Sequence, residues 1–216
     1  MAKVNTNEEL LENAELQTKS FFTKHSKTII GTFIAVLVIA MGIALWQLAW
    51  VKPLEREAQV ALFKAQSAFE SQTADYAALL VEFENVAANY GSTPAGNEAH
   101  FYAAACALRT GDVEKASQNI EAFEEMDGEM GAAVNALAIV LKGDIAVEKQ
   151  QIAEAVALYE EAAETVNAYS APMALLKAAR CYIALGEGEK AQVALKKIVE
   201  NYGSSAQALE AQKMMK

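Results

Sequence analysis

The chain has 216 residues, of which 53% are hydrophobic, with only three prolines, 11 glycines and a net charge of −10. This composition excludes a disordered chain, which would be less apolar, and an all-β sandwich or barrel, which would need more turn residues, so we expect an all-α fold. Residues 1–51 carry four lysines and four glutamates, so the whole net charge belongs to residues 52–216 and argues against nucleic acid as a partner.

An uncharged run of 23 residues, 29–51, follows a polar segment at residues 1–28. As a helix this run is about 34 Å long, which is enough to cross a bilayer. A buried core helix is one alternative, although a charge usually interrupts such helices sooner. A cleaved signal peptide is another, but the run ends in the bulky "WQLAWV" and not in small residues. The sequence therefore predicts a retained transmembrane helix over 29–51.

The charges that flank this span predict its orientation. Lys19, Lys24 and Lys27 precede the span, whereas Lys52 and Arg56 follow it. This modest bias, together with the short polar segment before the first span, predicts a cytoplasmic tail over 1–28 and an exported domain over 52–216.

Small residues recur at intervals of four within the span, a pattern that favours close packing between membrane helices. Such pairs also occur by chance in apolar helices that only face lipid. The candidates for helix packing in the membrane are Gly31, Ala35, Ala40, Gly42 and Ala44.

From Leu54 onward, apolar residues recur at intervals of three and four, which predicts a series of helices separated by short turns. The turn "RTGDVEKA" at 109–116 returns as "ALGEGEKA" at 184–191. Ala116, Ala155 and Ala191 each stand just inside the helix that follows such a turn, at intervals of 39 and 36 residues. An echo between "NYGSTPAGNEA" and "NYGSSAQALEA" adds a degenerate copy in which Leu79 occupies the alanine position. We expect three clear helical hairpins, one degenerate hairpin and a C-terminal capping helix.

This periodicity resembles that of tetratricopeptide repeats, which are paired helices of about 34 residues with small residues where the helices cross. The first helices carry small residues at Ala104, Gly143 and Ala179, and Tyr159 and Ala162 match the bulky and small positions of a second helix. The proline that usually ends each unit is missing. The resemblance implies an α-solenoid of the tetratricopeptide-repeat type.

The layout of the whole chain, a short tail, one span and an exported repeat domain, resembles the YfgM-like family of bacterial inner-membrane proteins. The stretch "YGSTPAGNEAHFYAA" resembles members from Bacteroidetes-type bacteria. This resemblance implies an ancillary component of the Sec translocon in the inner membrane, with its C-terminal domain in the periplasm. It also implies translocon subunits, periplasmic chaperones or exported clients as partners.

The sequence offers little catalytic chemistry. His25 and His100 fall on opposite sides of the membrane in the expected topology, and no residues have metal-ligand or phosphate-loop spacing. We therefore expect no enzyme, no cofactor and no metal. Cys106 and Cys181 suggest a disulfide in an exported domain, but they lie in non-adjacent repeats, so buried free thiols are the preferred interpretation.

A surface is the stronger candidate for function, because the first helices of such repeats line a concave face. We expect an apolar stripe with a charged margin that binds an apolar helix or an unfolded segment of a client. A tightly wound stack would instead bury the same stripe as core, and this alternative stays open. The candidate groove consists of Phe101, Leu108, Arg109, Val140, Asp144, Val147, Leu176, Lys177, Arg180 and Ile183.

The sequence therefore predicts a membrane-anchored scaffold or adaptor at the protein-export machinery, with protein partners and the bilayer as its contacts. The alternative is a self-assembling structural envelope protein that binds no client.

Overall fold

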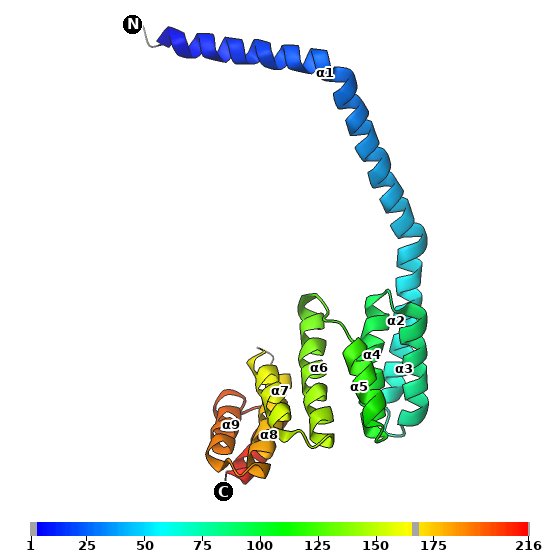
Figure 1. The fold of residues 1–216 in the computed structure, drawn as a ribbon, viewed down its shortest axis with the longest axis vertical. Coiled ribbons are helices and arrows are strands. Elements are labelled where there is room, and N and C mark those ends of the chain that lie inside the picture. The colour runs from blue at the N-terminus through cyan, green and yellow to red at the C-terminus, as the bar shows by residue number, and fades with distance from the viewer. Residues whose placement is uncertain (1–3, 166–168, 216) are drawn as a thin grey trace. The chain divides into compact units, whose positions relative to one another are not determined.

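The computed structural model describes residues 4–165 and 169–215, and every regular element in these ranges is a helix. The chain divides after Pro53 into two units, an N-terminal unit of residues 1–53 and a C-terminal unit of residues 54–216 (Figure 1). The elements are α1 (Val4–Trp46), the π-helix η1 (Gln47–Val51), α2 (Lys52–Phe69), α3 (Tyr76–Tyr90), α4 (Pro94–Arg109), α5 (Val113–Ala122), α6 (Gly128–Glu148), α7 (Ile152–Glu164), α8 (Ser170–Ala184), α9 (Gly188–Asn201) and α10 (Ala206–Met214).

The N-terminal unit contains the apolar run, which forms the second half of α1 and continues through η1. Its most apolar stretch is wholly exposed. A long apolar helix without a cover of its own is compatible with a single-pass membrane anchor. The span is followed by Lys52, the residue before Pro53. The backbone N–H of Lys52 donates to the carbonyl of Gln47, which lies five residues earlier in the chain. Pro53 lacks an N–H group and cannot continue an α-helical ladder back into the span.

The C-terminal unit is a row of helical hairpins, α2/α3, α4/α5, α6/α7 and α8/α9, and α10 packs on α8 and α9. The expected set of three clear hairpins, one degenerate hairpin and a capping helix is thus confirmed. Within each of the three clear hairpins the two helices pack directly on each other.

The same turn joins the two helices of all three clear hairpins. Gly111, Gln150 and Gly186 have φ angles of 81°, 61° and 76°, in the left-handed region that ends a helix. The residue that follows each of them donates its N–H to a carbonyl five residues earlier, as Asp112 does to Ala107 at 2.9 Å. Asp112 then caps α5 by accepting a hydrogen bond from the N–H of Lys115. The recurring "RTGDVEKA" and "ALGEGEKA" are therefore structural turns.

Small residues allow the helices of each hairpin to approach closely. Ala104, Ala179, Ala116, Ala155 and Ala191 are all almost fully buried. At Gly143 a Cβ atom would lie 2.5 Å from Cε1 of Tyr159 on α7. In the degenerate hairpin Leu79 is buried as well, so a larger residue fills the equivalent place.

Helix α6 connects two apolar cores. The first core contains residues of α2 to α5 and reaches α6 through Leu141 and Ile145. The second contains residues of α7 to α10 and reaches α6 through Val140 and Ala146. Although α6 is long and apolar enough to cross a membrane, these contacts identify it as a core helix.

Candidate protein-binding hollow

Three successive first helices, α4, α6 and α8, border a shallow hollow of about 370 Å³. Its apolar part comes from Leu108 and Val147, which are half-buried. The lining consists of Leu108, Asp144, Val147, Glu148, Tyr159, Lys177, Arg180 and Cys181.

Asp144 holds the polar part of the hollow in place. Its Oδ1 atom accepts a hydrogen bond from the Tyr159 hydroxyl and another from Nζ of Lys177, each at 2.6 Å. Burial and the hydrogen bond to Asp144 both raise the pKa of Tyr159, so its hydroxyl remains a donor. Arg180 forms an ion pair with Glu210 of α10. The charges at the margin are thus largely neutralised within the chain.

The structure brings five of the ten predicted groove residues together in this hollow: Leu108, Asp144, Val147, Lys177 and Arg180.

The other five predicted residues lie elsewhere. Val140 and Leu176 are only 4% and 6% exposed and belong to the second core, so they do not line an open surface. Phe101 is half-buried against Phe123. Arg109 donates to the Tyr76 hydroxyl at 2.7 Å and stacks over that ring, which places it against the first hairpin. Ile183 is exposed but lies outside the lining of the hollow.

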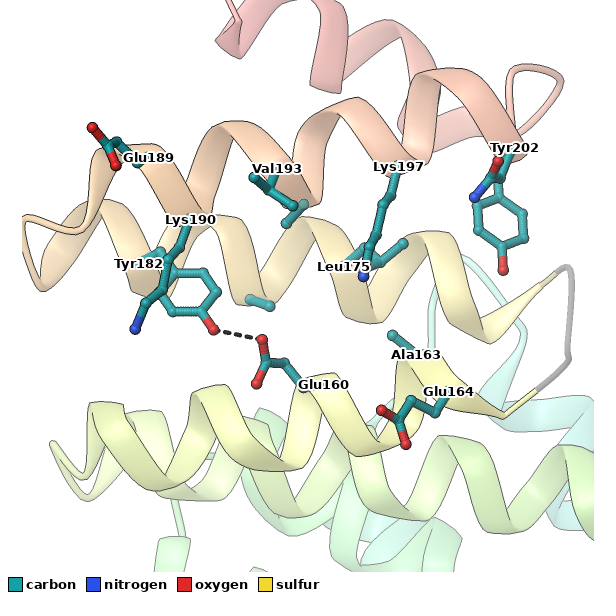
Figure 2. A pocket seen from close by; sticks show the side chains of 13 residues that line it. Glu160, Ala163, Glu164, Leu175, Tyr182, Glu189, Lys190, Val193, Lys197 and Tyr202 are labelled. Atoms are coloured by element: carbon teal, nitrogen blue, oxygen red, sulfur yellow. Dashed lines mark hydrogen bonds between the residues drawn. The ribbon is translucent and has the colours of Figure 1, made fainter.

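Sequence reasoning missed two features of this region. Tyr159 and Cys181 were assigned to packing alone, yet both also line the hollow. A larger groove between the second helices α7 and α9 lies outside the predicted concave face, which consists of first helices alone (Figure 2). In the sequence, the acidic side of this groove is indicated by the four glutamates of α7.

Comparison with known families decides the classification. The tetratricopeptide repeat-like domain family matches residues 19–129, which is just over half of the chain, and a second tetratricopeptide repeat family matches residues 146–213. The chain belongs to the tetratricopeptide repeat-like family. A search of curated proteins gave no significant match.

The family match covers the span as well as the repeats, and it bears on the kind of function. The match at 19–129 includes the apolar span as well as the first two hairpins. Tetratricopeptide repeats are generally non-catalytic scaffolds for protein–protein interaction, and no group of three potential metal ligands occurs among the described residues. Membership of this family implies protein partners in general.

The small residues of the span are all exposed within the described part of the N-terminal unit. A Cβ atom added at Gly31 or Gly42 would meet nothing within 4 Å. Packing of Gly31, Ala35, Ala40, Gly42 and Ala44 against another membrane helix thus stays a prediction.

Both cysteines of the repeat domain are free and buried, in agreement with the preferred interpretation. Cys106 lies in the first core and Cys181 in the second. Burial raises the pKa of the Cys106 thiol to about 12, so at pH 8 the thiol stays protonated and unreactive.

We expect Cys106 to resist alkylation by iodoacetamide at pH 8 in the folded chain and to react at once in the denatured chain. Peptide mass spectrometry after timed alkylation measures both rates. Equal rates for Cys106 in the two states would contradict its burial.

Proposed function

We propose that this protein is a membrane-anchored scaffold that binds a segment of another protein in the hollow on its first helices. The observation that carries the proposal is the meeting of Leu108 and Val147 with a charged margin from three successive first helices. A single hairpin could not form this surface, so the repeat array itself builds the site.

The lining favours an amphipathic helix or an unfolded apolar segment as the occupant. Asp144 is already paired with Lys177, and Arg180 with Glu210, so these charges offer little net attraction to a charged ligand. Apolar contact with Leu108 and Val147 would supply most of the affinity, while the charged margin would select the orientation of the segment.

Within this scaffold function, we assign the protein to the protein-export machinery of a bacterial inner membrane. The resemblance of the whole layout to YfgM-like proteins supports Sec translocon subunits, periplasmic chaperones or exported clients as partners. It also supports a cytoplasmic N-terminus and a periplasmic repeat domain. The apolar, unburied helix supports the bilayer as a further contact.

End-to-end assembly without a client is less well supported. Helix α10 packs on α8 and α9 and buries Ala208 and Ala211. The last hairpin is therefore covered, as in the terminal repeats of other solenoids.

Photo-crosslinking from the hollow tests the proposal. A photoreactive amino acid at Val147, in the full-length chain in intact cells, should capture a translocon subunit, a periplasmic chaperone or an exported protein, identified by mass spectrometry. The matched control is Glu114, which is exposed on the second helix α5. Equal capture from Val147 and Glu114 would contradict a role for the hollow, and partners unrelated to export would contradict the assignment to the export machinery.

A further inference from the structure

A surface groove of about 790 Å³ lies between the second helices α7 and α9 of the repeat domain, on a floor of α8 (Figure 2). It shares no lining residue with the hollow on the first helices. Leu175 and Ala178 of α8 and Ala163 of α7 contribute apolar surface to it. A ligand for this groove must therefore be partly apolar.

The two walls of the groove carry opposite charges. Helix α7 contains four glutamates and no basic residue, and Glu160 and Glu164 line the groove. Helix α9 lines it with Lys190 and Lys197, together with Glu189. Helices α7 and α9 run parallel to each other along the groove. Glu160 and Lys190 therefore lie near one end of it, and Glu164 and Lys197 lie near the other (Figure 2).

The two ends differ in how far their charges are already satisfied. Near the first end, Glu160 accepts a hydrogen bond from the Tyr182 hydroxyl, and Lys190 forms an ion pair with Glu187 at 2.6 Å. Near the second end, Glu164 and Lys197 are exposed, and neither forms an ion pair or a side-chain hydrogen bond with another described residue. These two charges are available to an external partner.

The wall formed by α9 also carries an uncovered apolar side chain. Val193 is 58% exposed, although it lies between the two lysines on the groove side of its helix. Helix α9 thus has the features that the groove requires of a ligand, an apolar ridge flanked by positive charges that complement the acidic wall.

We propose that a second copy of this chain occupies the groove, with helix α9 of each copy seated in the groove of the other. A two-fold axis parallel to α7 and α9 places α7 of one copy opposite α9 of the other. Because the axis is parallel to the helices, residues at the same level along the groove still face each other. Glu164 of one copy then faces Lys197 of the other, and the reverse pair forms by symmetry. Val193 of each copy covers the apolar floor of its partner.

Charge complementarity favours a second copy over an unrelated helix. Glu164 on the acidic wall and Lys197 on the basic wall lie at the same end of the groove, so two copies related by the axis can pair these charges. A stable soluble dimer buries roughly 800 Å² per partner. Anchoring of both copies in one bilayer would raise their effective concentration, so pairing would require less contact area than in solution. The inference is independent of the hollow on the first helices.

A charge-exchange experiment tests the pairing. Two differently tagged full-length chains are co-expressed, extracted in mild detergent, captured by one tag and quantified by the other. Glu164→Lys in both chains places two lysines opposite each other, and Lys197→Glu in both chains places two glutamates opposite each other. We expect either change to lower recovery of tagged pairs by about tenfold, because two attractive contacts become repulsive.

The mixture provides the decisive measurement. A chain with Glu164→Lys and a chain with Lys197→Glu restore both attractive contacts, so we expect recovery within about twofold of the unmodified pair. The control substitutions are Glu161→Lys and Lys196→Glu, which are exposed neighbours outside the groove lining and should leave recovery within about twofold. Circular dichroism of each variant confirms that it is folded.

The proposal is overturned if the unmodified chains give no tagged pairs, if the mixture fails to recover, or if the controls weaken pairing equally. Loss of a different co-purifying protein from the Glu164→Lys chain, without any pairing of the unmodified chains, would also overturn it. That result would identify an unrelated protein as the occupant.

Discussion

Replacing Leu176 or Val140 by glutamate should lower the free energy of unfolding of the repeat domain by about 3–5 kcal/mol. Each side chain is almost fully buried among the apolar residues of the second core, so a carboxylate there would lose its hydration. Thermal unfolding followed by circular dichroism of the full-length chain in detergent measures the loss.

Ile183→Glu is the matched control for this prediction. Ile183 belongs to the same predicted stripe, but the residue is 51% exposed, so we expect a change of less than about 1 kcal/mol. If Leu176→Glu and Val140→Glu were as mild as Ile183→Glu, the whole stripe would be open to solvent and the core assignment would be wrong.

Gly143→Ala should destabilise the third hairpin by a net 1–3 kcal/mol, roughly. The new Cβ atom would lie within 3.0 Å of three ring atoms of Tyr159, whose side chain is fully buried. The ring cannot move freely, because its hydroxyl is held by Asp144 at 2.6 Å. Alanine is the better helix former by about 1 kcal/mol, so a net loss would show that the clash outweighs propensity. Urea unfolding of the two chains measures the difference.

Gly188→Ala separates this clash from the general effect of replacing glycine. A Cβ atom at Gly188, at the start of α9, would meet nothing within 4 Å. We expect the stability to stay equal or to rise by up to about 1 kcal/mol. A loss of similar size at both positions would rule out the contact with Tyr159 as the cause.

The architecture of the repeat domain was predictable because its signals are local and recur. The turns at Gly111 and Gly186 share a backbone conformation, and the buried alanines that follow them keep the same spacing. Gln150 takes up that conformation without being glycine, so there the spacing of Ala155 was a better guide than the turn residue itself. The apolar span was equally clear, since its composition alone meets the length of a bilayer.

The candidate site was only partly predictable, because helical periodicity assigns residues to a face but does not say how far neighbouring helices cover that face. Val140, Asp144 and Val147 lie on one side of α6, yet Val140 is in the core and the other two reach the hollow. The groove between α7 and α9 depends on the separation of two helices that are not adjacent in the chain. The acidic character of α7 was visible in the sequence, but its basic counterpart on α9 could not be placed opposite it.

Because α6 supplies side chains to both cores, the two halves of the repeat domain share one helix. Leu141 and Ile145 belong to one core, whereas Val140 and Ala146 belong to the other. Loss of either core would expose one side of α6, and the other core packs against the same helix. We therefore expect the four hairpins to unfold together, with α6 as the helix that couples the two cores.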